Sequence, residues 1–432
     1  MPITLEAGEK KFDAKFAALL TMKRETSVEV SEVVAAIIAD VIADGDEALF
    51  RFTEKFDGVS FDGQSVRVSD AEIREAVTQI DADTLNALDL AAERIRSFHQ
   101  RQLPKDDQYI DQAGVGLGQK WTAIEAAGLY VPGGQAAYPS SVLMNAIPAR
   151  VAGVERVAMV VPTPDGILNP LVLAAAAKAG VSEIFKVGGA QAVAALAYGT
   201  ESIAPVDKIV GPGNAFVAAA KRQVFGKVGI DMIAGPSEIL VVADAQNNPD
   251  WIAADLLSQA EHDASSQSIL ITDDAAFCQA VRDAVERQLP SLPRQETARQ
   301  SWKDFGATIL VDNLDDAIPL VDQIAPEHLE LAVSDAEAER LSKEIRNAGA
   351  IFLGRHTPEA IGDYVAGTNH VLPTARSARF SSGLSVYDFM KRTTLVHCSP
   401  DGLAAIGGAA VTLADAEGFD AHARSVSIRL NR

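Results

Sequence analysis

From residue 121 onward the sequence repeats one pattern, in which a short apolar run leads through a turn, often rich in glycine, into a segment with helical spacing of apolar residues. Examples are "RVAMVVPTP" before "NPLVLAAAAKAG", then "EIFKVGGAQAVAALAYG", "KIVGPGNAFVAAAKRQV", and "EILVVADA" before "DWIAADLLSQAEH". The apolar runs "SILITDD", "ATILVDN" and "AIFLG" continue the alternation. Parallel strands need a crossover connection, usually a helix, so the pattern predicts an α/β fold with doubly wound parallel sheets, two in succession.

The two ends of the chain depart from this pattern. Residues 1–110 read as helical: "VSEVVAAIIADVIADGDEALFRFTEKFD" has helical spacing with an Asp-Gly stop. The segment "DADTLNALDLAAERIRSFHQRQLP" starts with an aspartate cap and ends before Pro104. Residues 376–432 are mixed in composition and finish in a helix-like stretch. We therefore expect a helical N-terminal region and a separate C-terminal segment.

Composition excludes several classes of protein. A formal net charge of -21 argues against nucleic acid or an anionic membrane as partner, because both need a basic surface. The N-terminal "MPITLEAGEKKFDAKF" has no apolar core of a signal peptide, and residues 171–181 are too short to span a bilayer, so we expect a cytoplasmic protein. Only Cys278 and Cys398 occur, which excludes a disulfide framework and a cysteine-based zinc module.

Three glycine-rich turns mark candidate ligand sites, at residues 130–141, 187–191 and 211–216. Backbone N–H groups at such turns, together with the dipole of the following helix, can bind a phosphate. Tyr130 could stack on a flat ring. The dinucleotide fingerprint is incomplete, because Phe216 stands where its third glycine would be. Plain packing between strand and helix is the competing interpretation, and the turns alone do not name NAD.

The seven histidines divide into two groups. His99, His356 and His397 lack polar company in sequence and are interpreted as structural or solvated. The others lie among polar, glycine-rich or carboxylate-rich residues; they are His262, His328, His370 and His422.

Two stretches place acids and amides beside these histidines. In "DLLSQAEHD", Gln259 and His262 are three residues apart and would share a helix face, although glutamine is a poor metal ligand; Glu261 points elsewhere. In "IAPEHLELAV", Glu327 and His328 are adjacent bases that could serve two steps on one substrate. A solvated acidic stretch remains the alternative for the second segment.

Two later stretches add further candidates. Residues 362–390 are rich in Gly, Ser, Thr and Asn, as in a binding loop, and contain Asp363 and His370. Glu417 and His422 are five apart near the C-terminus, where an isolated pair is ordinarily a pair of surface residues.

The motifs G-x-S-x-G, H-E-x-x-H and G-x-x-x-x-G-K-[ST] are absent, which argues against a nucleophile-elbow hydrolase, a zincin and a P-loop NTPase. The residues by themselves indicate an α/β enzyme with a polar His/Asp/Glu site.

Taken together, these segments resemble the histidinol dehydrogenase family. The resemblance is carried by "GLYVPGGQAAYPSSVLMNAIPA", "VGGAQAVAALAYGT", "KIVGPGNAFVAAAKRQV", "DMIAGPSEIL", "DLLSQAEHD", "APEHLEL" and "GDYVAGTNHVLPT". They occur in this order over residues 121–374, and the similarity extends to the C-terminus, whereas the N-terminal hundred residues carry no motif.

The resemblance implies a role for each candidate residue. The zinc ligands would be Gln259, His262, Asp363 and His422, and the acid/base pair would be Glu327 and His328. The NAD contacts would be Tyr130, Gln191 and Asn214. The substrate contacts would be Ser237, Glu417 and the zinc ligands, with His328 and His370 close by.

The resemblance also implies the reaction and the architecture. The reaction is the oxidation of L-histidinol to L-histidine through L-histidinaldehyde, with two NAD consumed; His328 would be the base and Glu327 would activate water. The fold would be two successive incomplete Rossmann-like domains and a tail that completes the partner's site in a homodimer. The resemblance implies four divisions. Residues 1–120 would be helical and partly packed with the second α/β domain, and residues 121–237 would form the first α/β domain, with the NAD contacts. Residues 238–375 would form the second, with zinc and the catalytic residues, and residues 376–432 would form the tail.

Three alternatives differ from this interpretation. A related zinc- and NAD-dependent enzyme could oxidise another amino or sulfonated alcohol. A zinc hydrolase could use Glu327 to activate water, and a non-catalytic protein could bind a ligand at the glycine turns. Because the third fingerprint glycine is missing, we also expect a looser, more exposed NAD site than in a conventional Rossmann domain.

Overall fold

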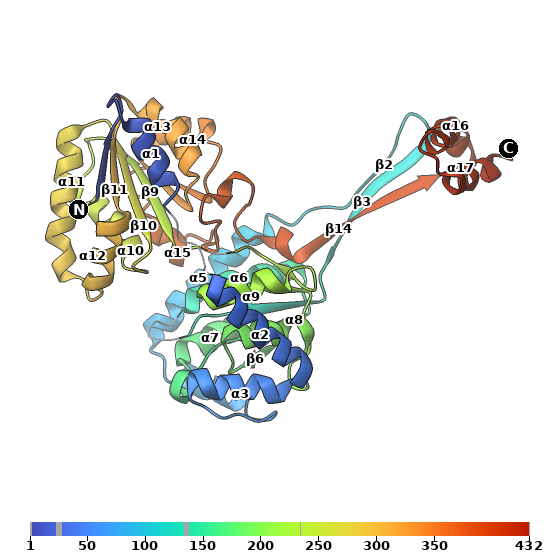
Figure 1. The fold of residues 1–432 in the computed structure, drawn as a ribbon, viewed down its shortest axis with the longest axis horizontal. Coiled ribbons are helices and arrows are strands. Elements are labelled where there is room, and N and C mark those ends of the chain that lie inside the picture. The colour runs from blue at the N-terminus through green and yellow to red at the C-terminus, as the bar shows by residue number, and fades with distance from the viewer. Residues whose placement is uncertain (1, 23–27, 134–137, 234, 432) are drawn as a thin grey trace.

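The structure, a computed structural model, describes residues 2–22, 28–133, 138–233 and 235–431. Two α/β bodies lie next to each other, and a long three-stranded arm projects away from them and ends in a pair of helices at the C-terminus (Figure 1). No helix within the described ranges is long and apolar enough to cross a membrane.

The first body is built on five parallel strands in the order β6-β5-β4-β7-β8. Their bounds are β4 (Ala126–Tyr130), β5 (Arg156–Val160), β6 (Glu183–Phe185), β7 (Lys208–Val210) and β8 (Gly229–Ile230). In chain order these are the third, second, first, fourth and fifth strands, which is the Rossmann order without its sixth strand. The expectation of an incomplete Rossmann-like sheet is confirmed.

Helices cover both faces of this sheet, because successive residues of β4 and β5 point alternately to two separate cores. One core includes α4 (Asp70–Thr78), α5 (Ala82–Gln100), α6 (Pro139–Ala152) and α7 (Pro170–Ala179). The other includes α2 (Val28–Asp44), α3 (Asp46–Asp57), α8 (Gly189–Tyr198) and α9 (Ala215–Val224). The predicted Asp-Gly stop separates α2 from α3 at Gly45, whose φ is 55°, and the predicted aspartate cap is Asp81, which accepts from the N–H of Thr84.

The second body repeats the topology with one added edge strand, in the order β1-β11-β10-β9-β12-β13, all parallel. The strands are β1 (Ile3–Glu6), β9 (Glu238–Ala243), β10 (Gln267–Thr272), β11 (Ala307–Leu310), β12 (His328–Ala332) and β13 (Ala350–Leu353). Its helices are α1 (Phe12–Leu20), α10 (Pro249–Ala260), α11 (Ala275–Gln288), α12 (Gln295–Phe305), α13 (Ala317–Ile324), α14 (Asp335–Glu344) and α15 (Glu359–Tyr364). Short 3-10 turns are Pro164–Gly166, Leu289–Ser291, Leu314–Asp316, Ser377–Arg379, Val386–Phe389 and Ile428–Leu430.

The prediction of an entirely helical N-terminal region is wrong at both of its ends. The chain begins with β1, which pairs with β11 some 300 residues later and buries Leu5 in the core of the second body. The region also ends in strands, β2 (Asp107–Ile110) and the start of β3 (Val115–Ala123). Such short segments gain their strand conformation from distant partners, which local spacing cannot reveal.

The arm is an antiparallel sheet in which β3 lies between β2 and β14 (Met390–Cys398). It leads to α16 (Pro400–Ala416) and α17 (Asp420–Ser427) at its tip (Figure 1). The segment predicted as a tail is therefore divided. Leu384, Val386 and Phe389 are buried in the core of the first body, and the projecting part begins only at Met390.

Candidate functional site

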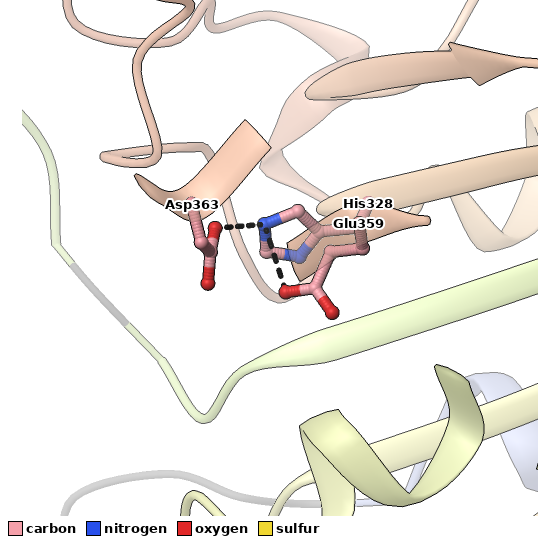
Figure 2. Close-up of side chains that lie close together, drawn as sticks. All are labelled: His328, Glu359 and Asp363. Atoms are coloured by element: carbon pink, nitrogen blue, oxygen red, sulfur yellow. Dashed lines mark ion pairs between the residues drawn. The ribbon is translucent and has the colours of Figure 1, made fainter. Parts of the chain in front are cut away.

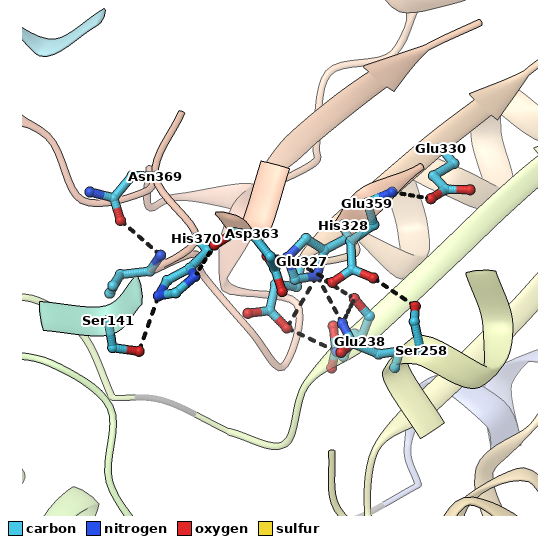
Figure 3. A network of polar contacts seen from close by, with 12 residues as sticks. Ser141, Glu238, Ser258, Glu327, His328, Glu330, Glu359, Asp363, Asn369 and His370 are labelled. Atoms are coloured by element: carbon cyan, nitrogen blue, oxygen red, sulfur yellow. Dashed lines mark hydrogen bonds and ion pairs between the residues drawn. The ribbon is translucent and has the colours of Figure 1, made fainter. Parts of the chain in front are cut away.

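Buried polar side chains gather at the amino ends of two neighbouring strands, β9 and β12 (Figure 3). Glu238 is the first residue of β9, Glu327 immediately precedes β12, and His328 is its first residue. The backbone N–H of Glu238 donates to Oε2 of Glu327 at 2.9 Å. Glu327 is fully enclosed rather than part of a solvated acidic stretch, so the solvated alternative for this segment is excluded.

His328 is held with one ring nitrogen free. Its Nδ1 lies 2.9 Å from the backbone oxygen of Glu238, and its Nε2 is buried without a hydrogen-bond partner among the described residues. Burial lowers the pKa of His328, although the nearby carboxylate of Asp363 opposes this. In the tautomer whose Nδ1–H donates to Glu238, the neutral ring presents a lone pair at Nε2, as a general base requires.

Gln259, in the last turn of α10, contacts the same groups. Its Nε2 donates to the backbone oxygen of Glu238 at 3.3 Å. It also lies 3.0 Å from Nδ1 of His328, which cannot accept a hydrogen bond while Nδ1–H donates to Glu238. With the amide nitrogen so engaged, its Oε1 is buried and has no partner in the described part of the chain. A buried amide oxygen left unpaired is costly to folding, so this atom is available for a ligand such as a metal ion.

Two carboxyl groups from α15 face the free nitrogen of His328 (Figure 2). Oε1 of Glu359 and Oδ1 of Asp363 each lie 3.7 Å from Nε2 of His328, and the three side chains are close enough to hold one metal ion. Burial raises the pKa of Glu359 to about 7, and burial together with the charge of Glu359 raises that of Asp363 to about 6.

Glu359 was not among the residues predicted from the sequence. It precedes Asp363 by four residues on one helix, so the two share a face, and that spacing was the available signal. Its carboxylate accepts from the hydroxyl of Ser258 at 3.1 Å, and its backbone N–H donates to Glu330. Glu330 in turn shares a buried hydrogen bond with Asp255, which forms a second layer behind the site.

The negative charge of the site is not balanced by the chain. Within the described ranges, no lysine or arginine forms an ion pair with Glu327, Glu359 or Asp363. Burial, followed by repulsion from neighbouring carboxylates, raises the pKa of Glu327 well above its usual range. Imidazole, carboxylate and amide oxygen donors around unbalanced negative charge fit a divalent cation such as zinc.

His370 connects this site to the first body. Its Nδ1 lies 3.1 Å from the backbone oxygen of Asp363, and its Nε2 lies 3.2 Å from the hydroxyl of Ser141 in α6 (Figure 3). The ring therefore bridges the two bodies beside Asp363, and burial lowers its pKa.

The single chain brings some of the remaining predicted site residues near His328 and leaves others apart from it. Helix α10 ends at Ala260, so His262 lies in the following turn and not on the helix. Its side chain is exposed but near enough to His328 for the two rings to interact electrostatically. Ser237 is half-buried beside Glu238. Glu417 and His422 are exposed; they lie at the end of α16 and in α17, the helices at the far end of the arm, away from the second body of the same chain (Figure 1).

The predicted cofactor contacts lie at the carboxyl edge of the first sheet. Tyr130, at the end of β4, is buried, and its hydroxyl accepts from the N–H of Gly189 at 3.0 Å, so its ring faces are not open for the expected stacking. Gln191 is buried, and its Oε1 is without a partner among the described residues. Asn214 is exposed and caps α9 by accepting from two backbone N–H groups. Residues 134–137 of the first glycine-rich turn lie outside the described residues.

Packing explains several glycines of these turns. A Cβ on Gly188 would lie 2.3 Å from Pro162, one on Gly211 would lie 2.2 Å from the backbone oxygen of Tyr130, and one on Gly213 would lie 2.4 Å from Val217. These glycines are required by the close approach of neighbouring segments. The case for a cofactor at this edge therefore depends on the polar groups rather than on the glycines.

Comparisons with known proteins agree on one family. A family model described as histidinol dehydrogenase matches residues 20–430. The chain is 65% identical to the histidinol dehydrogenase of Bradyrhizobium diazoefficiens, with 100% of each chain covered, and 66% identical to that of Agrobacterium fabrum, with 100% and 99% covered. The crystal structure of histidinol dehydrogenase from Elizabethkingia anophelis superposes with a TM-score of 0.94 at 38% identity, covering 100% of this chain and 98% of that one.

Proposed function

Since the chain belongs to the histidinol dehydrogenase family, we propose that it oxidises L-histidinol to L-histidine, through L-histidinaldehyde, by two successive hydride transfers to NAD. This reaction would complete histidine biosynthesis. The observation that carries the proposal is the buried Nε2 of His328, which has no hydrogen-bond partner among the described residues and lies beside Glu327 and Asp363. An alcohol must lose a proton as its hydride leaves, and a neutral imidazole in a water-poor site is suited to receive it.

Glu327 has a separate task in the second oxidation. The aldehyde must gain water before the second hydride can leave, and a carboxylate can take the proton of that water. Oε2 of Glu327 lies 3.7 Å from Nδ1 of His328, so one bound substrate can reach both groups. Burial, and then repulsion from neighbouring carboxylates, raises the pKa of Glu327; a cation in the site would lower it and so would favour the ionised base.

The residues that would hold zinc are Gln259, His262, Asp363 and His422 of the partner subunit. Two neutral imidazoles, one carboxylate and one neutral amide leave such a site with a net charge of about +1. When bound, the metal would position the substrate through its amino and imidazole nitrogens. His328 then remains free for proton transfer, whereas a site made of His328, Glu359 and Asp363 would consume the base.

Two isosteric variants distinguish these metal sites. We expect Asp363→Asn to lose zinc on dialysis, because it removes a charged ligand, and Glu359→Gln to keep the zinc content of the wild type. Metal analysis of the dialysed proteins measures both. Loss of zinc in Glu359→Gln as complete as in Asp363→Asn would instead assign the metal to the group that contains Glu359.

A homodimer explains the position of the tail. The arm is exposed along its length and presents apolar side chains to solvent, among them Ile110 and Val396. Its tip carries Glu417 and His422, with exposed Leu413 and Phe419 beside them. An apolar exposed surface of this kind marks an interaction site, and a second copy of the chain would gain from it the residues that its own site lacks.

The decisive experiment is the yield of NADH from L-histidinol. We expect two NADH per histidinol, loss of activity with a chelator, and recovery with zinc. A yield of one would indicate a simpler alcohol dehydrogenase, and no NADH from histidinol would refute the proposal.

A further inference from the structure

Asp57 is a buried carboxyl group at a position that disfavours a negative charge. It is the last residue of α3 and only 9% exposed, at the end of the helix where the dipole is negative. In the described part of the chain it forms no ion pair, and its one hydrogen bond is from the backbone N–H of Thr163 at 3.2 Å. Burial raises its pKa. The fold gains little from a carboxyl at this position, which points to a ligand.

Asp57 lies at the carboxyl edge of the first sheet. Thr163 follows β5, which is the second strand of that sheet in chain order. The charge of Asp57 acts on the hydroxyl of Tyr130, at the end of the neighbouring β4. The same edge holds two polar atoms that are buried without partners among the described residues, Oγ1 of Thr163 and Oε1 of Gln191. Both residues are almost fully enclosed, at 0% and 1% exposure, so polar groups at this edge are left for a ligand to pair.

In Rossmann domains that bind NAD, an acidic side chain near the end of the second strand accepts hydrogen bonds from the adenosine ribose, and an arginine replaces it where the cofactor is NADP. The strand order of the first sheet places the end of β5 at the corresponding point. Here the acid comes from α3, a helix that precedes the sheet in sequence. We propose that Asp57 receives the adenosine ribose hydroxyls of NAD and excludes NADP, an inference that rests on the proposed NAD-dependent function.

The selectivity for NAD over NADP would come from the negative charge of the buried Asp57 carboxylate. A carboxylate accepts hydrogen bonds from the 2′- and 3′-hydroxyls of the ribose, and such charge-assisted bonds are about twice as strong as neutral ones. The 2′-phosphate of NADP would bring a second negative charge against it. Because Asp57 is buried, salt screens that repulsion less than it would at the surface.

The test compares Asp57→Asn with Asp165→Asn. The first variant keeps an acceptor oxygen for the N–H of Thr163 but removes the charge. Asp165 is a matched control because it is an acid close to Asp57 but exposed. A Cβ on Gly58, the residue after Asp57, would lie 3.6 Å from Oδ1 of Asp165. With L-histidinol, we expect Asp57→Asn to raise the NADP-to-NAD ratio of kcat/KM by about 10- to 100-fold, mainly through a higher KM for NAD, and Asp165→Asn to leave it unchanged.

An unchanged ratio in an active Asp57→Asn enzyme, or a shift carried by Asp165→Asn instead, would overturn the assignment. A second measurement uses the wild type and so does not depend on how the variant folds. We expect 5′-AMP to compete with NAD and 2′,5′-ADP to compete at least about tenfold more weakly; equal competition would also overturn the assignment. If the wild type made no NADH from histidinol, calorimetric titration with NAD and NADP would still test Asp57, and the proposed function would fail separately.

Discussion

Replacing Lys221 by methionine should destabilise the protein and weaken NAD binding together. Lys221 lies in α9 and forms an ion pair with Asp231, and both side chains are at most 3% exposed. Lys221 Nζ also donates to the backbone oxygen of Gly211 at 3.0 Å, while Asp231 accepts from the N–H of Gly211 at 2.8 Å. The pair therefore holds Gly211 at both of its backbone groups, three residues before the predicted cofactor contact Asn214.

The size of the effect follows from the burial of both charges. Removing one partner of a buried pair strands the other charge and typically costs 3–5 kcal/mol. Two backbone N–H groups, of Gly211 and Met232, still donate to Asp231 in the variant, so we expect the lower end, about 3 kcal/mol. In the double variant Lys221→Met, Asp231→Asn, the amide oxygen keeps an acceptor and no charge is stranded. Its loss should be smaller than the sum of the two single losses by roughly 1–3 kcal/mol.

The measurement is the melting temperature of the single and double variants at one fixed subunit concentration, because the stability of an oligomer depends on concentration. For a domain of this size, about 3 kcal/mol corresponds to a shift of roughly 6–12 °C. The KM for NAD should rise in Lys221→Met while kcat changes less, since the proposed acid/base pair lies on the other body. A single variant that loses less than about 1 kcal/mol, or strict additivity in the double variant, would refute the reasoning.

Three further perturbations address the acid/base pair, the shared site and the buried acids. Glu327→Gln keeps an acceptor for the N–H of Glu238, so histidinol-to-aldehyde hydride transfer should persist while aldehyde oxidation slows at least about 100-fold; equal loss in both half-reactions would contradict separate roles. Mixing His262→Ala subunits with His422→Ala subunits should restore part of the activity, and no recovery would count against sites built from two chains. Burial raises the pKa of Asp255 to about 6 and that of Glu330 well above its usual range, so the native state holds protons that the unfolded state releases. The melting temperature should therefore fall as pH rises from about 4 through about 6, and Glu330→Gln should flatten that slope; an unchanged slope would exclude the pair as its source.

Local pattern was enough to predict the two sheets, because each strand, turn and helix between residues 121 and 353 carries its own signal. It was not enough for β1 or the arm. The four residues of β1 pair with β11, and β14 pairs along its whole length with β3, more than 260 residues earlier in the chain. Strand β2 has no buried residue, so no apolar alternation marks it. In these segments the partner, and not the local sequence, determines the structure.

The candidate site was predictable where its residues stand in long motifs, as Gln259, His328 and Asp363 do. Motifs could not show that Glu359 and Glu238 complete the buried group, because both contribute through packing between segments that are distant in sequence. They also could not show that His262 lies beyond the end of its helix. That position is compatible with a metal site to which His262 contributes and which is completed only when the partner's tail binds. The mixing experiment tests this.

The predicted cofactor contacts lie at the carboxyl ends of parallel strands, where ligands of open α/β sheets usually bind, whereas the proposed catalytic residues lie at amino ends. In the second sheet, the switch point lies between β9 and β12, and Asn247 lies at its carboxyl side. This buried amide donates to the backbone oxygens of Asp244 and Ala332, the residues that follow β9 and end β12. These hydrogen bonds join the two strands at their carboxyl ends, and the proposed acid/base pair is at the opposite, amino ends of the same two strands.

The reason for this reversal is the way in which the two bodies meet. Ser141, at the start of the helix that follows β4, contacts His370, which contacts Asp363 of the second body. The carboxyl edge of the first sheet is thereby turned toward the amino edge of the second. A hydride must pass directly from substrate to cofactor, so the proposed NAD site and the proposed base have to face each other across one cleft. In the proposed function only the first sheet binds a dinucleotide, so only that sheet has to present its carboxyl edge to the cleft. The second sheet can present its amino edge, where its buried acids and His328 converge.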